Sequence, residues 1–272
     1  MLRIRQEQGF QYGYNAITTM EENEDNTMMD FGILRLGQGQ REELLDAEKE
    51  SALLLIQGRV TLQFDGQERT IERKSCFDEN PWVLHVPKAT PVTLIGAAAD
   101  SEISLTKTTN ERPFAAKLYT PEECAAEERG KGTMKETSTR IVRTVFDYSN
   151  APYSNLVIGE VIDHPGKWSS YPPHHHPQPE IYFYKFNPQQ GYGFSELGEE
   201  AVKLRHNDTV KILNSATHPQ ATAPGYAMYY IWVIRHLDGN PYKSPEYPVF
   251  VPEHLWVTDK EAKIWPDRES GV

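Results

Sequence analysis

Two clusters of short β-type segments constrain the fold of this chain more than any other feature of its sequence. The clusters comprise residues 31–36, 51–56, 59–64 and 92–96, then residues 156–162, 180–186, 201–213 and 226–234. The segments are short β-type runs, and Gly, Asp and Pro turns separate them, which is typical of successive strands. The 14 Tyr, 10 Phe and 5 Trp, with 19 Pro and 18 Gly, also favour many short strands over long helices. The sequence therefore predicts an all-β protein.

The polar, charged stretch between the clusters predicts two consecutive β modules joined by a linker. We expect an N-terminal module over residues 1–110, a linker over 111–139, a second module over 140–258 and a tail over 259–272. Within the linker, Thr120-Pro121-Glu122-Glu123 resembles a helix start, with Thr as the cap and Pro in the first turn. The linker is therefore expected to be short and helical.

A weak internal repeat relates the two modules. Residues from Glu50 align with those from Glu180, since each has an acidic residue, an apolar strand, a glycine turn and a return strand. In a second pairing Pro91 stands where His218 stands, and the stretch upstream of Glu50 contains no histidine. We therefore expect two similar modules, with a histidine cluster only in the second.

Charge and composition exclude several classes of partner. The net charge of −11, from 28 basic and 39 acidic residues, opposes binding to nucleic acid or anionic membranes. The N-terminus is polar and no segment has the length of a membrane helix, so a cytoplasmic location is expected. Cys76 and Cys124 are far apart in sequence, so we interpret them as plain thiols.

The segment "YPPHHHPQPE", residues 171–180, carries the chemistry that stands out most. In an extended chain His174 and His176 share a face with Glu180, while His175 points to the other side. About forty residues later, His218 follows a predicted strand. Three imidazoles and one carboxylate suit a divalent metal, with Zn²⁺ or Mn²⁺ favoured and Fe²⁺ or Ni²⁺ as further options. Four protein ligands would leave one or two coordination positions open for chemistry.

Basic residues near the second cluster could recognise a substrate carboxylate. Arg140, Arg143 and Arg235 are the arginines nearest to it in sequence, and the guanidinium fork matches a carboxylate. In the first module, His85 lies among apolar neighbours and is interpreted as a hydrogen-bonded strand histidine rather than a ligand.

The second half of the chain closely resembles the 5-deoxy-glucuronate isomerase family of myo-inositol catabolism, within the cupin superfamily. The blocks that carry the resemblance are "GKWSSYPPHHH" (166–176), "EIYFYKFNPQQGYGF" (180–194), "HNDTVKILNSATHP" (206–219), "APGYAMYYIWV" (223–233) and "PEHLWV" (252–257). Over the first half the resemblance is weaker but collinear.

The resemblance implies a bicupin, which is two jelly-roll barrels in tandem, the first without metal ligands. It implies His174, His176, Glu180 and His218 as the ligands in the second barrel. The implied reaction is the aldose–ketose isomerisation of 5-deoxy-D-glucuronate to 2-deoxy-5-keto-D-gluconate, so the partner would be a small anionic sugar acid.

The residue that moves the proton stays open at this point. Tyr182, Tyr184, Lys185 and Tyr229 are candidates, and a hydride shift between the two carbons is an alternative. Three other functions compete with the isomerase: a ketol-isomerase of pectin-derived 5-keto-4-deoxyuronate, a cupin iron dioxygenase, and a sugar-acid-binding cupin without activity. The oligomeric state is also open, although the Tyr- and Pro-rich segment after residue 237 offers a surface for a homo-oligomer.

Overall fold

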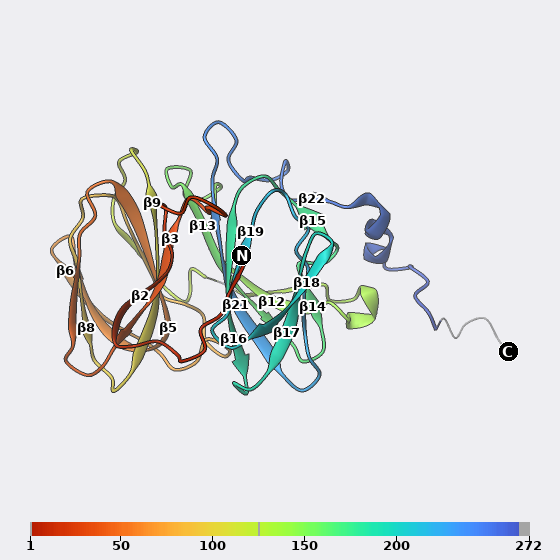
Figure 1. Ribbon diagram of the computed structural model, residues 1–272, viewed down its shortest axis with the longest axis horizontal. Helices are drawn as coiled ribbons and strands as arrows, with labels where there is room; N and C mark the ends of the chain where they lie inside the picture. Colours follow the sequence, from red (N-terminus) through yellow and green to blue (C-terminus); the bar gives the residue numbers. More distant parts are fainter. Residues whose placement is uncertain (1, 125, 267–272) are drawn as a thin grey trace.

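The computed structural model describes residues 2–124 and 126–266, which form two β-barrels packed side by side (Figure 1). The strands before the linker are β1 (Arg3–Ile4), β2 (Gly13–Thr18), β3 (Asp30–Leu36), β4 (Arg41–Leu44), β5 (Lys49–Phe64), β6 (Gln67–Arg73), β7 (Val83–Val86), β8 (Val92–Gly96) and β9 (Ser101–Thr109). Those of the linker and the second barrel are β10 (Lys117–Tyr119), β11 (Ala126–Arg129), β12 (Arg140–Phe146), β13 (Leu156–Asp163), β14 (Trp168–Ser169), β15 (His174–His175), β16 (Glu180–Asn187), β17 (Tyr192–Leu197), β18 (Glu200–Arg205), β19 (Thr209–Ile212), β20 (Gln220–Thr222), β21 (Ala227–Arg235) and β22 (Val249–Phe250). The helical elements of the described chain are the 3₁₀ turns η1 (Met134–Glu136) and η2 (Pro252–Thr258), so the all-β prediction is confirmed.

Each barrel consists of two facing sheets. In the first barrel one sheet has the order β10-β7-β5-β9-β3-β2, and the other is built from β4, β8, β5 and β6. The second barrel has one sheet of order β1-β19-β16-β21-β13-β12-β11 and one of order β14-β20-β17-β18, with β15 and β22 paired at its mouth. The larger sheets of the two barrels face each other across the middle of the molecule (Figure 1).

Alternation along the strands of these two larger sheets produces three apolar layers. In β16, Ile181 and Phe183 pack into the layer between the barrels, whereas Tyr182 and Tyr184 point into the second barrel. In β5, Leu54 belongs to the layer between the barrels, and Leu53 and Leu55 to the interior of the first. Each large sheet is therefore buried on both faces.

The linker differs from the expected helix. At Thr120 the chain forms a turn in which the amides of Glu123 and Cys124 donate to the carbonyls of Thr120 and Pro121. The Glu123 carboxylate accepts from the Thr120 amide at 3.0 Å, as in a helix cap, but residues 121–124 and 126–129 are not helical. Strand pairing takes over instead, because β10 joins the first barrel and β11 the second. The linker's helical part is the single turn η1, and the helix start predicted at Thr120 is wrong.

The first strand of the chain pairs with a strand of the second barrel. Strand β1 leaves the first module and pairs antiparallel with β19 of the second barrel, with Arg3 opposite Val210. The chain therefore ties the two barrels together at its start as well as through the linker.

The repeat aligned from sequence breaks down at a glycine. Gly58 does not form a turn, because β5 continues through it and bends from one sheet of the first barrel into the other, with a bulge between Leu55 and Gln57. Its φ is +103°, and an added Cβ would meet Ser101 at 2.5 Å. In the second barrel a true turn separates β16 from β17. Glu50 also faces the layer between the barrels, so its side chain is not placed like that of Glu180.

None of the helices in the described residues is long and apolar enough to cross a membrane.

Candidate metal centre and substrate cavity

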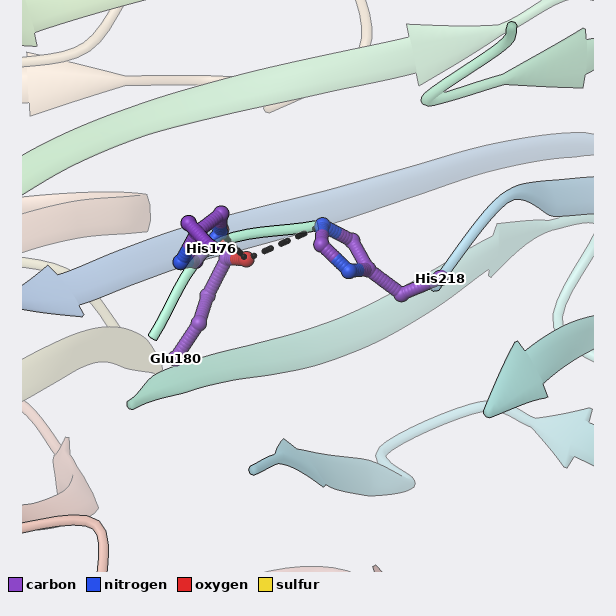
Figure 2. A group of neighbouring side chains, drawn as sticks. All are labelled: His176, Glu180 and His218. Atoms are coloured by element: carbon purple, nitrogen blue, oxygen red, sulfur yellow. Dashed lines mark hydrogen bonds and ion pairs between the residues drawn. The ribbon is translucent and has the colours of Figure 1, made fainter. Parts of the chain in front are cut away.

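Three side chains from separate segments of the second barrel meet at one point. His176 lies in the proline-rich stretch after β15, Glu180 is the first residue of β16, and His218 lies between β19 and β20. Figure 2 shows the carboxylate of Glu180 pointing at both imidazoles. Its Oε2 lies 3.2 Å from Nε2 of His176 and 3.4 Å from Nε2 of His218. All three side chains are buried, and among the described residues they form the group of potential metal ligands that lies close enough to share one ion.

Backbone carbonyls orient the imidazoles of this cluster. Nδ1 of His176 contacts the carbonyl of Gln178 at 3.0 Å, and Nδ1 of His218 contacts that of Ala216 at 2.9 Å. A neutral imidazole that donates from Nδ1 carries its lone pair on Nε2, which is the arrangement of a metal-binding histidine. Nε2 of His218 is buried and has no hydrogen-bond partner. An orphaned acceptor facing a buried carboxylate fits a cation at this point.

Burial controls the charge of the cluster. Removal from water raises the pKa of Glu180 to about 7 and lowers the pKa of His176 to about 4. The pKa of His218 is also lowered, first by burial, against the attraction of Glu180. The imidazoles are therefore neutral at pH 7, the form that binds metals, and among the described residues no lysine or arginine pairs with the carboxylate.

His174, the fourth predicted ligand, lies next to this group. Its ring centre is 4.7 Å from that of His218, in an edge-on arrangement, and its Nδ1 contacts the carbonyl of Pro172 at 3.2 Å. Nε2 of His174 therefore carries the lone pair when Nδ1 donates to this carbonyl. His174 does not lie within the close group, so its role as a ligand stays a prediction. His175, predicted to point away, pairs with Val249 of β22.

A cavity of about 490 Å³ opens above the cluster inside the second barrel. His174, His176 and Glu180 form part of its wall. The rest of the wall comes from the larger sheet and from the chain after β21, and includes Arg129, Arg140, Ser170, Tyr171, Tyr182, Tyr230, Trp232, Tyr242, Lys243, Tyr247 and Phe250. Positive side chains and hydroxyl groups thus face a space the size of a small polar molecule.

The chain between Tyr242 and Val251 covers the mouth of this cavity. Phe250 packs edge-on against His174 with ring centres 5.5 Å apart, and Tyr242 packs against His176 at 4.9 Å. The Val251 amide donates to the Pro173 carbonyl at 2.9 Å. Part of the Tyr- and Pro-rich segment after residue 237 therefore lies on the site itself, a contribution that sequence spacing did not indicate.

Of the predicted proton-transfer residues, only Tyr182 lines the cavity. Tyr184 lies deeper in the barrel, where its hydroxyl donates to Gln220 at 2.7 Å. Lys185 and Tyr229 are opposite each other on neighbouring strands and face the first barrel instead. Lys185 pairs there with Glu102, so neither side chain can reach the cavity.

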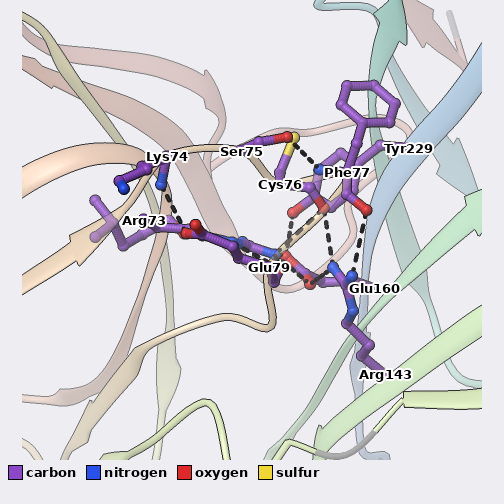
Figure 3. Close-up of polar contacts among 10 residues, drawn as sticks. Arg73, Lys74, Ser75, Cys76, Phe77, Glu79, Arg143, Glu160 and Tyr229 are labelled. Atoms are coloured by element: carbon purple, nitrogen blue, oxygen red, sulfur yellow. Dashed lines mark hydrogen bonds and ion pairs between the residues drawn. The ribbon is translucent and has the colours of Figure 1, made fainter.

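Of the predicted arginines, only Arg140 lines the cavity. Arg143 belongs to a buried network between the barrels, in which Glu160 binds Arg73, Arg143 and Tyr229 (Figure 3). Arg235 is buried at the end of β21, where it contacts the His236 carbonyl and Asp238.

Several cavity residues were not predicted from the sequence. Tyr230 and Trp232 share the face of Glu180, because they pair with Tyr184 and Tyr182 across the two strands. Alternation along β21 places Tyr230 and Trp232 on the same face of the strand. Only the strand register shows that this face points into the cavity. Arg129 reaches the cavity because β11 pairs with β12, which the predicted helix did not allow.

Comparison with known proteins gives the family context. The sequence pattern of the KduI/IolB family matches residues 3–257. The chain is 27% identical to 5-deoxy-glucuronate isomerase of Bacillus subtilis strain 168, over 90% of this chain and 93% of that protein. It is 28% identical to the protein of the same name from Geobacillus kaustophilus, over 84% of each.

Solved structures show the same architecture. An IolB-like protein from Salmonella typhimurium LT2 matches with a TM-score of 0.83 at 22% identity, over 95% of this chain and 100% of that chain. Oxalate decarboxylase of Lactobacillus farciminis matches with a TM-score of 0.67 at 11% identity, over 95% and 90%. These likenesses confirm the predicted bicupin fold.

Proposed function

Since the chain belongs to the KduI/IolB family, we propose that its second barrel is a metal-dependent isomerase that converts 5-deoxy-D-glucuronate into 2-deoxy-5-keto-D-gluconate. The observation that carries the proposal is the buried group of His176, Glu180 and His218, with its unpartnered imidazole nitrogen, at the wall of a polar cavity. Zn²⁺ or Mn²⁺ suits two imidazoles and one carboxylate, with His174 beside them.

The cavity's charge supports an anionic substrate. The chain as a whole is acidic, yet Arg129, Arg140 and Lys243 line this one space and outnumber its acidic residues, Asp147 and Glu180. A partly buried guanidinium can hold a sugar carboxylate by two parallel hydrogen bonds, which orients the chain of the sugar. Arg140 is the best placed for this role, because carbonyls of Ser138 and Tyr171 fix its side chain at 2.9 and 3.4 Å.

The remaining wall supports the reaction through orientation and exclusion of water. A divalent cation held by the cluster would supply Lewis acidity toward the sugar's carbonyl group. The hydroxyls of Ser170, Tyr182 and Tyr230 can bind the hydroxyls of an open-chain sugar. Phe250 and Tyr242 cover the cluster and limit the access of water, which strengthens electrostatic interactions inside the cavity.

Metal content and turnover, measured together, test the proposal. Mass spectrometry of untagged protein should find about one metal ion per chain, and the protein should isomerise 5-deoxy-D-glucuronate. His218→Ala should lose both, whereas His254→Ala should keep both, because the His254 side chain is 42% exposed and outside the cavity lining. Metal without turnover would refute the substrate and direct the assay to the pectin-derived uronate and then to oxygen uptake. Wild-type protein without metal would refute the mechanism.

A further inference from the structure

A row of hydroxyl groups connects the cavity with a buried carboxyl group behind its wall. The Tyr230 hydroxyl donates to Oγ of Ser169 at 2.8 Å, and Ser169 donates to Oδ2 of Asp163 at 2.8 Å. Ser170 lies 3.4 Å from the same Tyr230 hydroxyl. Tyr230 and Ser170 line the cavity, whereas Ser169 and Asp163 are fully buried.

The hydrogen bonds of this row have a defined direction. Tyr230 has one proton and donates it to Ser169, so its oxygen can only accept a hydrogen bond from the cavity side. Ser169 likewise donates to the carboxylate and accepts from Tyr230. A substrate hydroxyl near Tyr230 would therefore act as a donor at the start of a continuous path that ends at Asp163.

Local backbone conformation makes this path possible. Consecutive residues of a strand normally point to opposite faces, yet Ser169 and Ser170 both approach Tyr230. Ser170 has a φ of +49°, the left-handed region that non-glycine residues seldom adopt, and β14 ends at Ser169. Such a conformation beside a cavity is more often found at functional sites than elsewhere.

Asp163 is suited to gain and lose a proton. It is the last residue of β13, its side chain is buried, and its Oδ1 has no hydrogen-bond partner. Arg140, opposite Asp163 across β12 and β13, is the charged side chain that acts on it. Burial raises the pKa of Asp163 to about 8, so near neutral pH the neutral acid predominates and the ionised form, which can take up a proton, is the minor state.

We propose that Tyr230, Ser169 and Asp163 form a proton relay that takes the hydroxyl proton of the sugar during isomerisation and returns it to the product. This inference rests on the proposed function. It concerns the proton on oxygen, and a separate group or a hydride shift moves the hydrogen between C2 and C1.

The transfer balances without any further reactant. The O–H bond of the C2 hydroxyl breaks as an O–H bond forms on Tyr230, whose own proton passes to Ser169. The Ser169 proton passes to Oδ2 of Asp163, which becomes neutral as negative charge develops on the sugar. The reverse movement delivers the proton to the oxygen on C1, so Asp163 is ionised again at the end.

Three single variants interrupt the path at different points. Asp163→Asn keeps an acceptor for Ser169 but cannot take a proton, Ser169→Ala removes the middle hydroxyl, and Tyr230→Phe removes the cavity end. Each should lower kcat about 100-fold, since acid–base groups typically contribute such factors. KM should change less than about threefold in Asp163→Asn and Ser169→Ala, because neither residue lines the cavity. Ser195→Ala is the matched control, because Ser195 is equally buried in this barrel and does not line the cavity.

Double variants separate a relay from independent structural effects. Once the path is broken, a second break should cost little, so Asp163→Asn with Tyr230→Phe should be within about threefold of the slower single variant. If the double variant instead lost the product of the two single-variant factors in kcat, the relay would be refuted. A kcat of Asp163→Asn close to that of wild type, with metal content intact, would also refute it. Because wild-type turnover and metal are measured first, failure of the proposed function is distinguishable: wild-type protein would then be inactive.

Discussion

The buried ion cluster between the barrels gives a stability prediction that can be worked from the structure. Glu160 accepts from Arg73 at 2.7 and 2.8 Å and from Arg143 at 3.4 Å, and it also binds Tyr229 (Figure 3). Glu160→Gln keeps the shape but leaves two buried guanidinium groups without their counter-charge. Breaking one partner of a buried ion pair typically costs about 3–5 kcal/mol. At roughly 2–4 °C per kcal/mol for a protein of this size class, Tm should fall by roughly 6–20 °C.

Differential scanning calorimetry with a surface control measures this effect. Glu72→Gln removes a carboxylate whose contact with Arg59 is 4.0 Å long and half exposed, so its Tm should match that of wild type. Metal content should be unchanged in both variants, because Glu160 lies on the opposite face of the sheet from the cavity. A Tm of Glu160→Gln within about 3 °C of wild type would show that the network contributes little and would refute the reasoning.

Three further predictions follow from the second barrel. Arg140→Gln should raise KM about 10- to 100-fold with a smaller effect on kcat, because a charge-assisted hydrogen bond contributes about 1.5–3 kcal/mol. A change in kcat alone, measured by steady-state kinetics, would contradict a substrate-binding role of Arg140. Chelation of bound metal should lower the Tm of wild type but not that of His218→Ala, since a ligand that binds only the folded state stabilises it. Equal decreases in Tm in the two proteins would refute the cluster as the metal site. His206 accepts a hydrogen bond from the Phe186 amide at 3.1 Å, and burial lowers its pKa to about 4. The unfolded chain then binds more protons than the native one between pH 6.5 and 4, so the free energy of unfolding should fall as pH falls through this window. The fall should be less steep in His206→Asn. If the free energy of unfolding, measured with urea, had the same pH dependence in both proteins, this role of His206 would be refuted.

The metal-ligand candidates were accessible from sequence because their chemistry and their spacing are both local. Alternation predicted that His174, His176 and Glu180 share one face, and His176 and Glu180 do meet, although the chain bends at Pro177 and Gln178 instead of staying extended. The same alternation placed Tyr182 on the cavity side. His218 required a second segment, but the structure brings it to 3.4 Å from Glu180.

The residues that were wrongly predicted to line the site could not be placed from the sequence of any single strand. Lys185 and Tyr229 belong to apolar strands whose two faces look alike in sequence, and only the packing of the first barrel shows which face it covers. Arg143 is a typical carboxylate-binding residue, yet its partner Glu160 is on the neighbouring strand and faces the other barrel. The helix predicted at Thr120 failed for a similar reason, because pairing of β10 with β7 and of β11 with β12 overrode a local capping signal.

The larger sheet of the second barrel explains why the first barrel is needed even though the potential metal ligands lie in the second. Strands β16 and β21 present Tyr182 and Tyr230 to the cavity and, one residue away, Phe183 and Tyr229 to the first barrel. A strand that carries buried polar groups on one face needs firm packing on the other to hold them in place. The first barrel provides that packing through the shared apolar layer and through Arg73 and Glu102, which bind Glu160 and Lys185. The described residues of the first barrel contain no such ligand cluster, yet this barrel packs against the far face of the strands that form the cavity wall.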